Sequence, residues 1–327
     1  MDAYTLPTET TRARPLRDAF AASRNFLSRR QLVRRISPPA GPGAEPLGRL
    51  GSLEVRLANS PAEIRRAQAL RYQVFFEEMS ARGDLRTHSL RRDADRFDRV
   101  CDHILVLDRT AADRSLIGRR PRVVGTYRLL RDDAARLNGG FYTEAEFDIA
   151  PLIRMKPSLR FLELGRSCVL QPYRNKRTVE LLWHGVWSYV LAHGMDVMIG
   201  CASLEGTDPD RLALQLSFLH HHARAPDEWR VLAHDHLRVE MNRLPRSAID
   251  ARAALRLLPP LVKGYLRLGA FVGDGAVIDR RFGTIDVCIV LPVSAIRSRY
   301  MDYYGADASR YALKPRALPR GAPLSAA

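Results

Sequence analysis

The sequence predicts an α+β fold in which a mixed β-sheet is flanked by helices. The expected elements follow as strand, helix, three strands, helix, strand, helices and two strands, unlike the regular alternation of a doubly wound sheet. The segment Asp196–Ala202 is apolar almost throughout, as a central strand covered on both faces should be. Two strand patterns, His103–Leu107 and Arg122–Leu130, are separated by a polar turn and predict an antiparallel hairpin.

The first half of this pattern opens with a strand and a helix. Leu53–Leu57 alternates between apolar and polar residues, as a half-buried strand does. Residues 60–63 (Ser-Pro-Ala-Glu) form a capping box with proline at the first helical position, so we expect a helix from there to about Met79. A charged loop, Gly83–Arg99, then precedes the hairpin.

The second half centres on a strand, a basic turn and a helix. Arg160–Leu170 is strand-like and runs into the basic turn Gln171–Arg177. A helix from Thr178 should end at Gly194, because glycine is a common residue just after a helix. The rest is predicted as a mostly helical or irregular stretch, 211–269, followed by the strands Gly269–Ile278 and Thr284–Leu291.

Composition separates the two ends of the chain from its middle. Residues 1–50 are expected to form a basic arm and linker, 51–305 the folded domain, and 306–327 a flexible tail. Within the arm, Asp18–Ile36 has the pattern of a basic amphipathic helix, which favours contact with an anionic membrane surface. A disordered, arginine-rich leader explains the same segment equally well. Pro38–Gly48 reads as a linker.

The net charge of the chain limits the classes of partner that it attracts. Fifty-two Lys and Arg residues against 36 Asp and Glu residues give a net charge of +16, which attracts nucleic acid, an anionic membrane or an acidic protein. A genome rich in G and C would also inflate the arginine content. Nucleic-acid binding is the less favoured class, because no helix-turn-helix, zinc-finger or aromatic RNA-binding pattern is present.

Other features of the sequence point to the cytoplasm. No apolar run approaches the ~18 residues of a membrane span, and no secretory signal precedes the first arginines. The four cysteines are widely spaced and are expected to be buried free thiols. We therefore expect a cytoplasmic protein, with peripheral contact to the inner face of the membrane through the arm.

The sequence contains four motifs in order: Arg-x-x-x-Phe, Asp-x-x-Asp, Gly-Thr-Tyr-Arg-Leu and Glu-Leu-Gly-Arg. This ordered set resembles the acyl-homoserine-lactone synthase branch of the GNAT acyltransferases, which take acyl groups from acyl carrier protein. The resemblance implies a GNAT-like fold with site residues Arg71, Phe75, Asp95, Asp98, Arg128, Glu163 and Arg166.

Five longer segments carry a closer resemblance: 71–75 (RYQVF), 139–142 (GGFY), 162–169 (LELGRSCV), 200–209 (GCASLEGTDP) and 259–268 (PPLVKGYLRL). They resemble segments of the ornithine N-alpha-acyltransferases of ornithine-lipid synthesis, and the resemblance spans roughly residues 53–304. This implies transfer of a (3-hydroxy)fatty acyl group to the α-amine of ornithine, giving a lyso-ornithine lipid, with Phe141 among the substrate-binding residues. A homoserine-lactone-type or other N-acyl amino acid synthase is the alternative. A non-catalytic protein that binds nucleic acid, or a membrane surface through Asp18–Ile36, is less favoured.

Two departures from these families refine the hypothesis. Residues 171–177 (QPYRNKR) lack the glycines with which GNAT enzymes approach the pyrophosphate of coenzyme A, so the donor is expected to be acyl carrier protein with its phosphopantetheine thioester, and no further cofactor. The cations Arg174, Lys176 and Arg177 would then dock the acidic carrier protein. The tryptophan of the lactone synthases is absent from Met79–Asp84, which disfavours a signal synthase.

Amide formation from a thioester requires a neutral amine and a polarised carbonyl. Glu163, in an apolar strand, is the predicted base; a structural ion pair with Arg166 or Arg128 is the alternative. Backbone amides of Ser167, Cys168 and Val169 are expected to hold the thioester oxygen.

The remaining charged and metal-binding candidates are ambiguous. Asp95 and Asp98 are predicted to form an electrostatic cluster with Arg71 and Arg128 that shapes the acceptor pocket, although a solvated loop has the same composition. The histidines have no spacing typical of a metal site, so none is expected; they are His220, His221, His222, His234 and His236.

Overall fold

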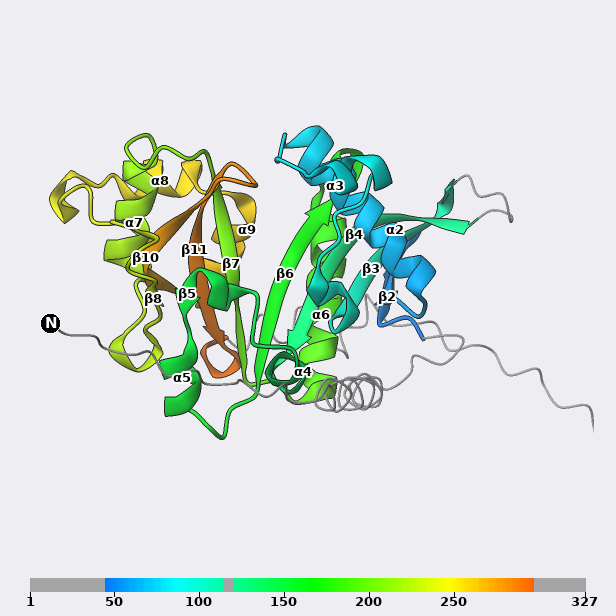
Figure 1. The fold of residues 1–327 in the computed structure, drawn as a ribbon, viewed down its shortest axis with the longest axis horizontal. Coiled ribbons are helices and arrows are strands. Elements are labelled where there is room, and N and C mark those ends of the chain that lie inside the picture. The colour runs from blue at the N-terminus through cyan, green and yellow to red at the C-terminus, as the bar shows by residue number, and fades with distance from the viewer. Residues whose placement is uncertain (1–44, 114–119, 297–327) are drawn as a thin grey trace, which may run out of the picture. The chain divides into compact units, whose positions relative to one another are not determined.

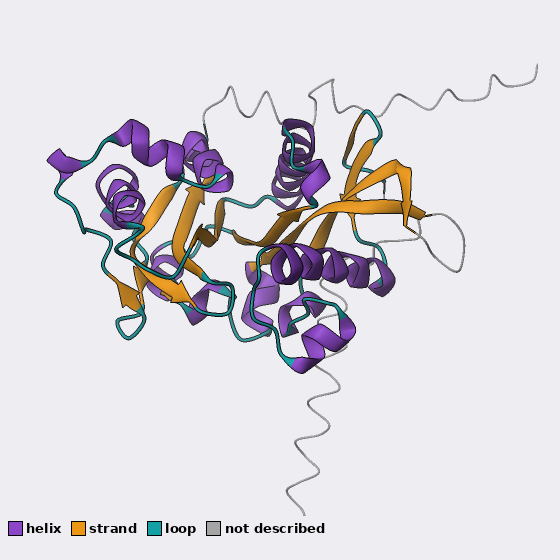
Figure 2. Ribbon diagram, turned by 90° about the horizontal axis from the view of Figure 1, so that it is seen from above, coloured by secondary structure: helices purple, strands orange, loops and turns teal. Residues whose placement is uncertain are grey.

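The computed structural model describes residues 45–113 and 120–296 (Figure 1). The amphipathic segment of the arm and the C-terminal tail lie outside these residues. The described strands form a mixed sheet in the order β1-β2-β3-β4-β6-β7-β11-β10-β8-β5, with β9 paired to β10. Helices lie on both sides of the strands (Figure 2), so the predicted α+β class with a mixed, helix-flanked sheet is confirmed.

The strands and helices have the following bounds. The strands are β1 (Gly48–Leu50), β2 (Leu53–Leu57), β3 (Asp102–Asp113), β4 (Arg120–Arg131), β5 (Phe147–Asp148), β6 (Phe161–Val169), β7 (Val197–Glu205), β8 (Leu232–Ala233), β9 (Arg238–Val239), β10 (Phe271–Asp279) and β11 (Thr284–Pro292). The helices are α2 (Pro61–Tyr72), α3 (Leu85–Leu90), α4 (Asp132–Leu137), α5 (Ala150–Met155), α6 (Lys176–His193), α7 (Ala213–Ala223), α8 (Ala251–Leu257) and α9 (Pro260–Leu268).

Local signals in the sequence set the ends of the two long helices. Ser60 caps α2 by accepting a hydrogen bond from the Glu63 amide at 3.3 Å, as the capping box predicts. The helix then widens into a π-helix, Gln73–Glu78. Helix α6 starts two residues before the predicted Thr178, because Asn175 serves as its N-cap. It ends at the predicted Gly194, which has the left-handed φ of 56°.

Four differences from the sequence analysis concern short elements. Strand β1 lies at the end of residues 1–50, predicted as arm and linker, and pairs with β2, so the sheet begins before residue 51. The predicted charged loop before the hairpin contains α3. Strands β8 and β9 interrupt the stretch predicted as helical or irregular. Helices α4 and α5 and strand β5 fill the gap between β4 and β6. Short elements carry too few periodic residues to be recognised from a pattern.

The sheet is split at its centre. Strands β6 and β7 are parallel and pair only from Phe161 to Glu163 on β6. Beyond Glu163, β6 continues with β4, and β7 continues with β11, so the two strands separate. Gly200 directly follows Ile199, the last residue of β7 that pairs with β6. A Cβ at Gly200 would come 2.3 Å from the carbonyl oxygen of Leu164. A residue without a side chain is therefore required where the strands part.

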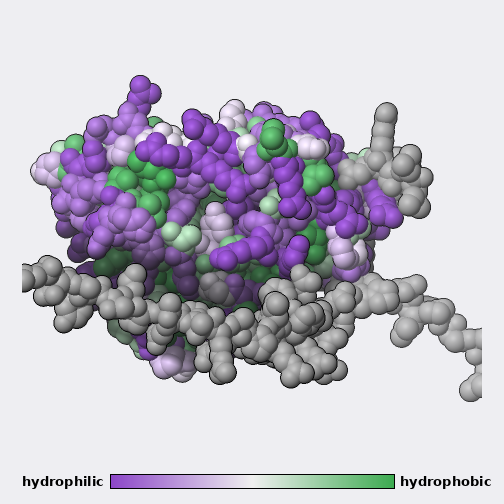
Figure 3. Space-filling view, viewed as in Figure 1, coloured by the Kyte–Doolittle hydropathy of each residue, from purple (hydrophilic) through white to green (hydrophobic). Residues whose placement is uncertain are grey.

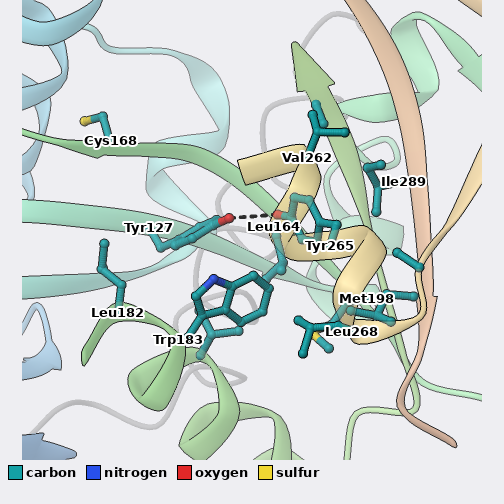
Figure 4. Packing of buried hydrophobic residues seen from close by; sticks show 14 of the residues in the cluster. Tyr127, Leu164, Cys168, Leu182, Trp183, Met198, Val262, Tyr265, Leu268 and Ile289 are labelled. Carbon is teal, nitrogen blue, oxygen red and sulfur yellow. Dashed lines mark hydrogen bonds between the residues drawn. The ribbon is translucent and has the colours of Figure 1, made fainter. Parts of the chain in front are cut away.

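Helices α6 and α9 cover one face of the sheet. Gly185 of α6 lies against Val55 and Ile104. Tyr265 of α9 shares a 2.7 Å hydrogen bond with Tyr127, the residue opposite Ile104 (Figure 4). Leu164 and Tyr265 also line a narrow apolar crevice beside the split, with no room for a water molecule. This face is therefore closed by packing.

The described surface gives no sign of a membrane-spanning element. Among residues 45–113 and 120–296, no helix is both long and apolar enough to cross a bilayer. The face seen in Figure 3 is mostly hydrophilic with separate apolar patches. Exposed apolar side chains such as Leu85, Met155 and Leu257 come from different elements.

Candidate active site

The face opposite α6 and α9 carries a row of polar side chains beside the split. Pairing of β4 with β6 places Arg128 and Glu163 on the same face, because Arg128 is level with Gly165, two residues from Glu163. Glu163 is level with Ile199, two residues before Cys201, and Cys201 is level with Cys288, two residues after Asp286. Arg128, Glu163, Cys201 and Asp286 therefore project from one face of four neighbouring strands.

A β-bulge aims Arg166 toward this row. Thr126 pairs with Cys168 and Arg128 with Gly165, so two residues of β6 oppose one of β4. Arg166, in the bulge, has the left-handed φ of 51°, which is uncommon for a residue with a side chain. Its guanidinium lies 4.7 Å from the centre of the Tyr142 ring.

Arg71 and Asp98 form the buried centre of an ion-pair network. Their closest atoms are 2.8 Å apart, and Arg71 is fully buried. Gln68 donates a second hydrogen bond to Asp98 at 2.9 Å. Burial alone would raise the pKa of Asp98, but Arg71 and Arg128 hold it below its ordinary value. Asp98 is therefore buried in an ion pair, and the alternative that it lies in a solvated loop is wrong.

The outer part of the network joins two arginines to the same loop. Arg128 binds both oxygens of Asp95 at 2.7 Å and Asp98 at 3.3 Å. Arg166 lies 3.2 Å from Asp93 and 3.4 Å from Asp95. Asp93 also pairs with Arg71 at 2.9 Å. The sequence did not single out Asp93 as a site residue, because it lies outside the Asp-x-x-Asp motif.

Glu163 has different partners from those expected. No ion pair to Arg166 or Arg128 is present among the described contacts of its carboxylate. Its oxygens instead accept hydrogen bonds from the amides of Tyr142 and Thr143 at 2.9 and 2.6 Å and from the Thr143 hydroxyl at 2.5 Å. Burial raises its pKa, and these donors oppose the rise. Glu163 thus fixes the 142–143 turn over the split.

Next to that turn lies a cluster that sequence reasoning missed: Glu146, Cys201 and Asp286. Their ligand atoms lie within 4.8 Å of one another. The Cys201 thiol donates to Glu146 at 3.3 Å, and the Thr284 hydroxyl to Asp286 at 2.8 Å. Burial raises the pKa of Asp286 to about 6. The sequence offered one indication of this cluster. Cys201 lies in the segment 200–209, and Glu146 lies shortly after the segment 139–142, two of the segments that carry the family resemblance.

This cluster is the one candidate metal group in the described part of the chain, but its donors suit a metal poorly. A metal binds the thiolate form of cysteine, and burial raises the pKa of Cys201 well above its ordinary value. Two of the histidines considered earlier hydrogen-bond to the backbone: His221 to the Leu244 carbonyl at 3.1 Å and His234 to the Glu144 carbonyl at 2.9 Å.

The aromatic and strand-end candidates separate into half-buried and buried residues. Phe75 is half-buried and packs edge-on against Phe282, 5.6 Å between ring centres. Phe141 is only 4% exposed and lies in the core, where it supports the 142–143 turn instead of lining a pocket. Cys168 is also buried, so only its backbone, like that of Ser167 and Val169, remains as a candidate contact at the end of β6.

The basic turn before α6 is compact. The amides of Tyr173, Arg174 and Asn175 donate to carbonyls of residues 170, 171 and 173. Arg174 pairs with Glu78 and donates to the Val169 carbonyl at 2.9 Å. Lys176 and Arg177 are exposed, and Lys176 lies 3.5 Å from Glu180.

The split sheet, the bulge beside it and the row of polar groups define an acyltransferase of the GNAT fold, and a model of the acetyltransferase (GNAT) domain matches residues 70–184. The chain is 53% identical over 272 residues to an L-ornithine N(alpha)-acyltransferase of Rhizobium meliloti (strain 1021), covering 83% of this chain and 90% of the relative. It is 56% identical over 265 residues to the enzyme of that name from Brucella abortus (strain 2308), covering 81% and 93%. The chain belongs to the L-ornithine N(alpha)-acyltransferase family.

Proposed function

We propose that the chain transfers a (3-hydroxy)fatty acyl group from acyl carrier protein to the α-amine of ornithine, forming a lyso-ornithine lipid. The acceptor follows from the names of relatives that match four-fifths of the chain. The observation that carries the proposal is the split between β6 and β7, because it leaves strand-edge donors beside a row of carboxylates and arginines.

The end of β6 would hold the thioester. Successive amides of a strand point in opposite directions. The Leu170 amide donates to Val124 of β4 at 2.9 Å, so the Val169 amide points toward the split. An amide there can stabilise the negative charge that develops on the thioester oxygen.

The acceptor would lie on the polar face. Ornithine carries two ammonium groups and one carboxylate at neutral pH. The Arg166 guanidinium, stacked on Tyr142, is placed to pair with the carboxylate, and Arg128 with Asp95 holds Arg166 in position. We assign both arginines to orientation of the acceptor.

The donor is inferred from the basic turn. Amides of residues 173–175 are already engaged within it, so they offer no cradle to the pyrophosphate of coenzyme A. Exposed Lys176 and Arg177 at the start of α6 suit the acidic surface of a carrier protein.

The test is incubation with one acyl group presented as the carrier-protein thioester or as the coenzyme A thioester, together with a panel of amino acids. Mass spectrometry should detect N-acyl ornithine, formed faster from the carrier protein. Equal kcat/KM values for the two donors would contradict the donor assignment, and a different preferred amino acid would contradict the acceptor assignment.

The docking prediction uses charge reversal. The Lys176→Glu, Arg177→Glu double variant should raise KM for the carrier protein at least several-fold with little change in kcat, because these side chains lie outside the reacting row and act by electrostatic attraction. Arg211→Glu, an exposed arginine in another region, is the control. A loss confined to kcat would contradict a docking role.

A further inference from the structure

We propose that Glu146 is the base that removes a proton from the acceptor's α-ammonium group. The inference deepens the proposed function and rests on it. Glu163, the base expected from the family motif, would then be a positioning residue.

The position of Glu146 carries the argument. It directly follows the single helical turn Thr143–Ala145, which the three hydrogen bonds to Glu163 fix over the split. Its carboxylate accepts a hydrogen bond from the thiol of Cys201, which lies two residues beyond Ile199, the last residue of β7 that pairs with β6. The carboxylate therefore lies where β6 and β7 part, on the face that carries Arg166.

Access to a substrate distinguishes the two glutamates. Glu163 is 5% exposed, and both of its oxygens accept backbone amides. Glu146 is half-buried. Among the described residues, its carboxylate accepts a hydrogen bond from the thiol of Cys201, which is a weak donor. A base needs an accessible oxygen that can receive a new proton, and Glu146 meets that requirement better.

The surroundings of Glu146 match its basicity to neutral pH. Burial, followed by the charge of Asp286, raises its pKa to about 7, against the opposing effects of Cys201 and Arg166. The other facing groups are Asp279 on β10, Tyr142 in the preceding turn, and His234, whose amide donates to the Glu146 carbonyl at 3.0 Å. General bases work best when their pKa lies near the working pH.

The proposed step balances as follows. One proton moves from the α-ammonium nitrogen to a Glu146 oxygen, and the freed lone pair forms a C–N bond to the thioester carbon. The C–S bond breaks, and the second proton lost by nitrogen passes to the departing phosphopantetheine sulfur. Glu146 then returns its proton to solvent. Cys201 stays a neutral thiol throughout, because its raised pKa keeps it protonated.

The first test compares Glu146→Gln with Glu163→Gln, using ornithine and acyl carrier protein. Wild-type kcat/KM should rise with pH and level off above about 7, because the base must be deprotonated. Glu146→Gln should lower kcat ~10²-fold or more and remove this limb. Glu163→Gln should retain the limb whatever its rate. Loss of the limb in Glu163→Gln alone would overturn the proposal.

The second test shifts the limb without removing the base. Asp286→Asn deletes the neighbouring charge that raises the pKa of Glu146, so the limb should move to lower pH. An unmoved limb in this variant, or a Glu146→Gln variant with normal kcat and only a raised KM for ornithine, would overturn the base role. Failure of the wild type to acylate ornithine would instead refute the proposed function itself.

Discussion

At the scale of single residues, the network around Asp98 has a clear physical rationale. Arg71 is fully buried, and an ionised guanidinium away from water needs counter-charges. Asp98 supplies one at 2.8 Å and is itself only 3% exposed. The pattern of motif residues predicted that these charges meet. It did not predict that both residues of the pair are buried. Because they are buried, the pair stabilises the site and does not itself line the acceptor pocket.

Asp98→Asn should therefore destabilise the folded protein by about 3 kcal/mol, because it leaves buried Arg71 and Arg128 short of a counter-charge. The folded-state pKa of Asp98 lies below its unfolded value, so its contribution is present above pH about 4 and is lost as the pH falls. Urea unfolding at pH 7 and pH 3 should show a difference from wild type that shrinks in acid. Arg211→Gln, which breaks an exposed pair, is the control and should change little.

At the scale of elements, the split depends on how two parallel strands diverge. Hydrophobic patterning identified both strands, β7 because it is apolar over most of its length and β6 because apolar residues flank Glu163. The pattern could not show that pairing stops at Glu163, because that depends on contacts with β4 and β11 on the outer sides. Gly200 and the bulge at Arg166 mark the point of divergence from the two sides.

Gly200→Ala should be strongly destabilising, by about 2 kcal/mol or more, because the new methyl group would meet the Leu164 carbonyl oxygen in the rigid centre of the sheet. Gly264→Ala in α9 is the matched control. Nothing lies within 4 Å of a Cβ there, and alanine favours a helix over glycine by about 0.5–1 kcal/mol, so it should stabilise. Equal unfolding midpoints for the two variants would contradict this account of the split.

At the scale of the whole molecule, the N-terminal arm and the folded domain are predicted to have separate tasks. Among the described residues, sheet pairing begins at β1, and the Leu47 amide already donates to the Val55 carbonyl at 2.8 Å. The domain therefore starts a few residues earlier than composition suggested. Peripheral membrane contact through the arm stays a prediction from its basic amphipathic pattern.

Deletion of residues 1–44 should spare the described sheet and the activity on soluble substrates, but weaken binding to vesicles that contain anionic lipid. Co-sedimentation with anionic and with neutral vesicles measures the first effect, and the acyl-transfer assay measures the second. Loss of carrier-protein affinity in the truncated protein would show that the arm serves the donor instead. Added salt weakens both contacts and does not separate them.

The sequence by itself determined the class of fold, the long helices and strands, and the family, because periodicity, caps and ordered motifs are local signals. The motif resemblance singled out Arg128, Glu163 and Arg166 as candidate site residues. Only the tertiary structure brought Glu146 beside Cys201 and Asp286, three residues from separate segments with no shared motif. It also gave Glu163 its hydrogen-bond partners in the 142–143 turn. Burial and the proximity of charges set the pKa of a carboxylate, and both depend on the folded arrangement of distant residues.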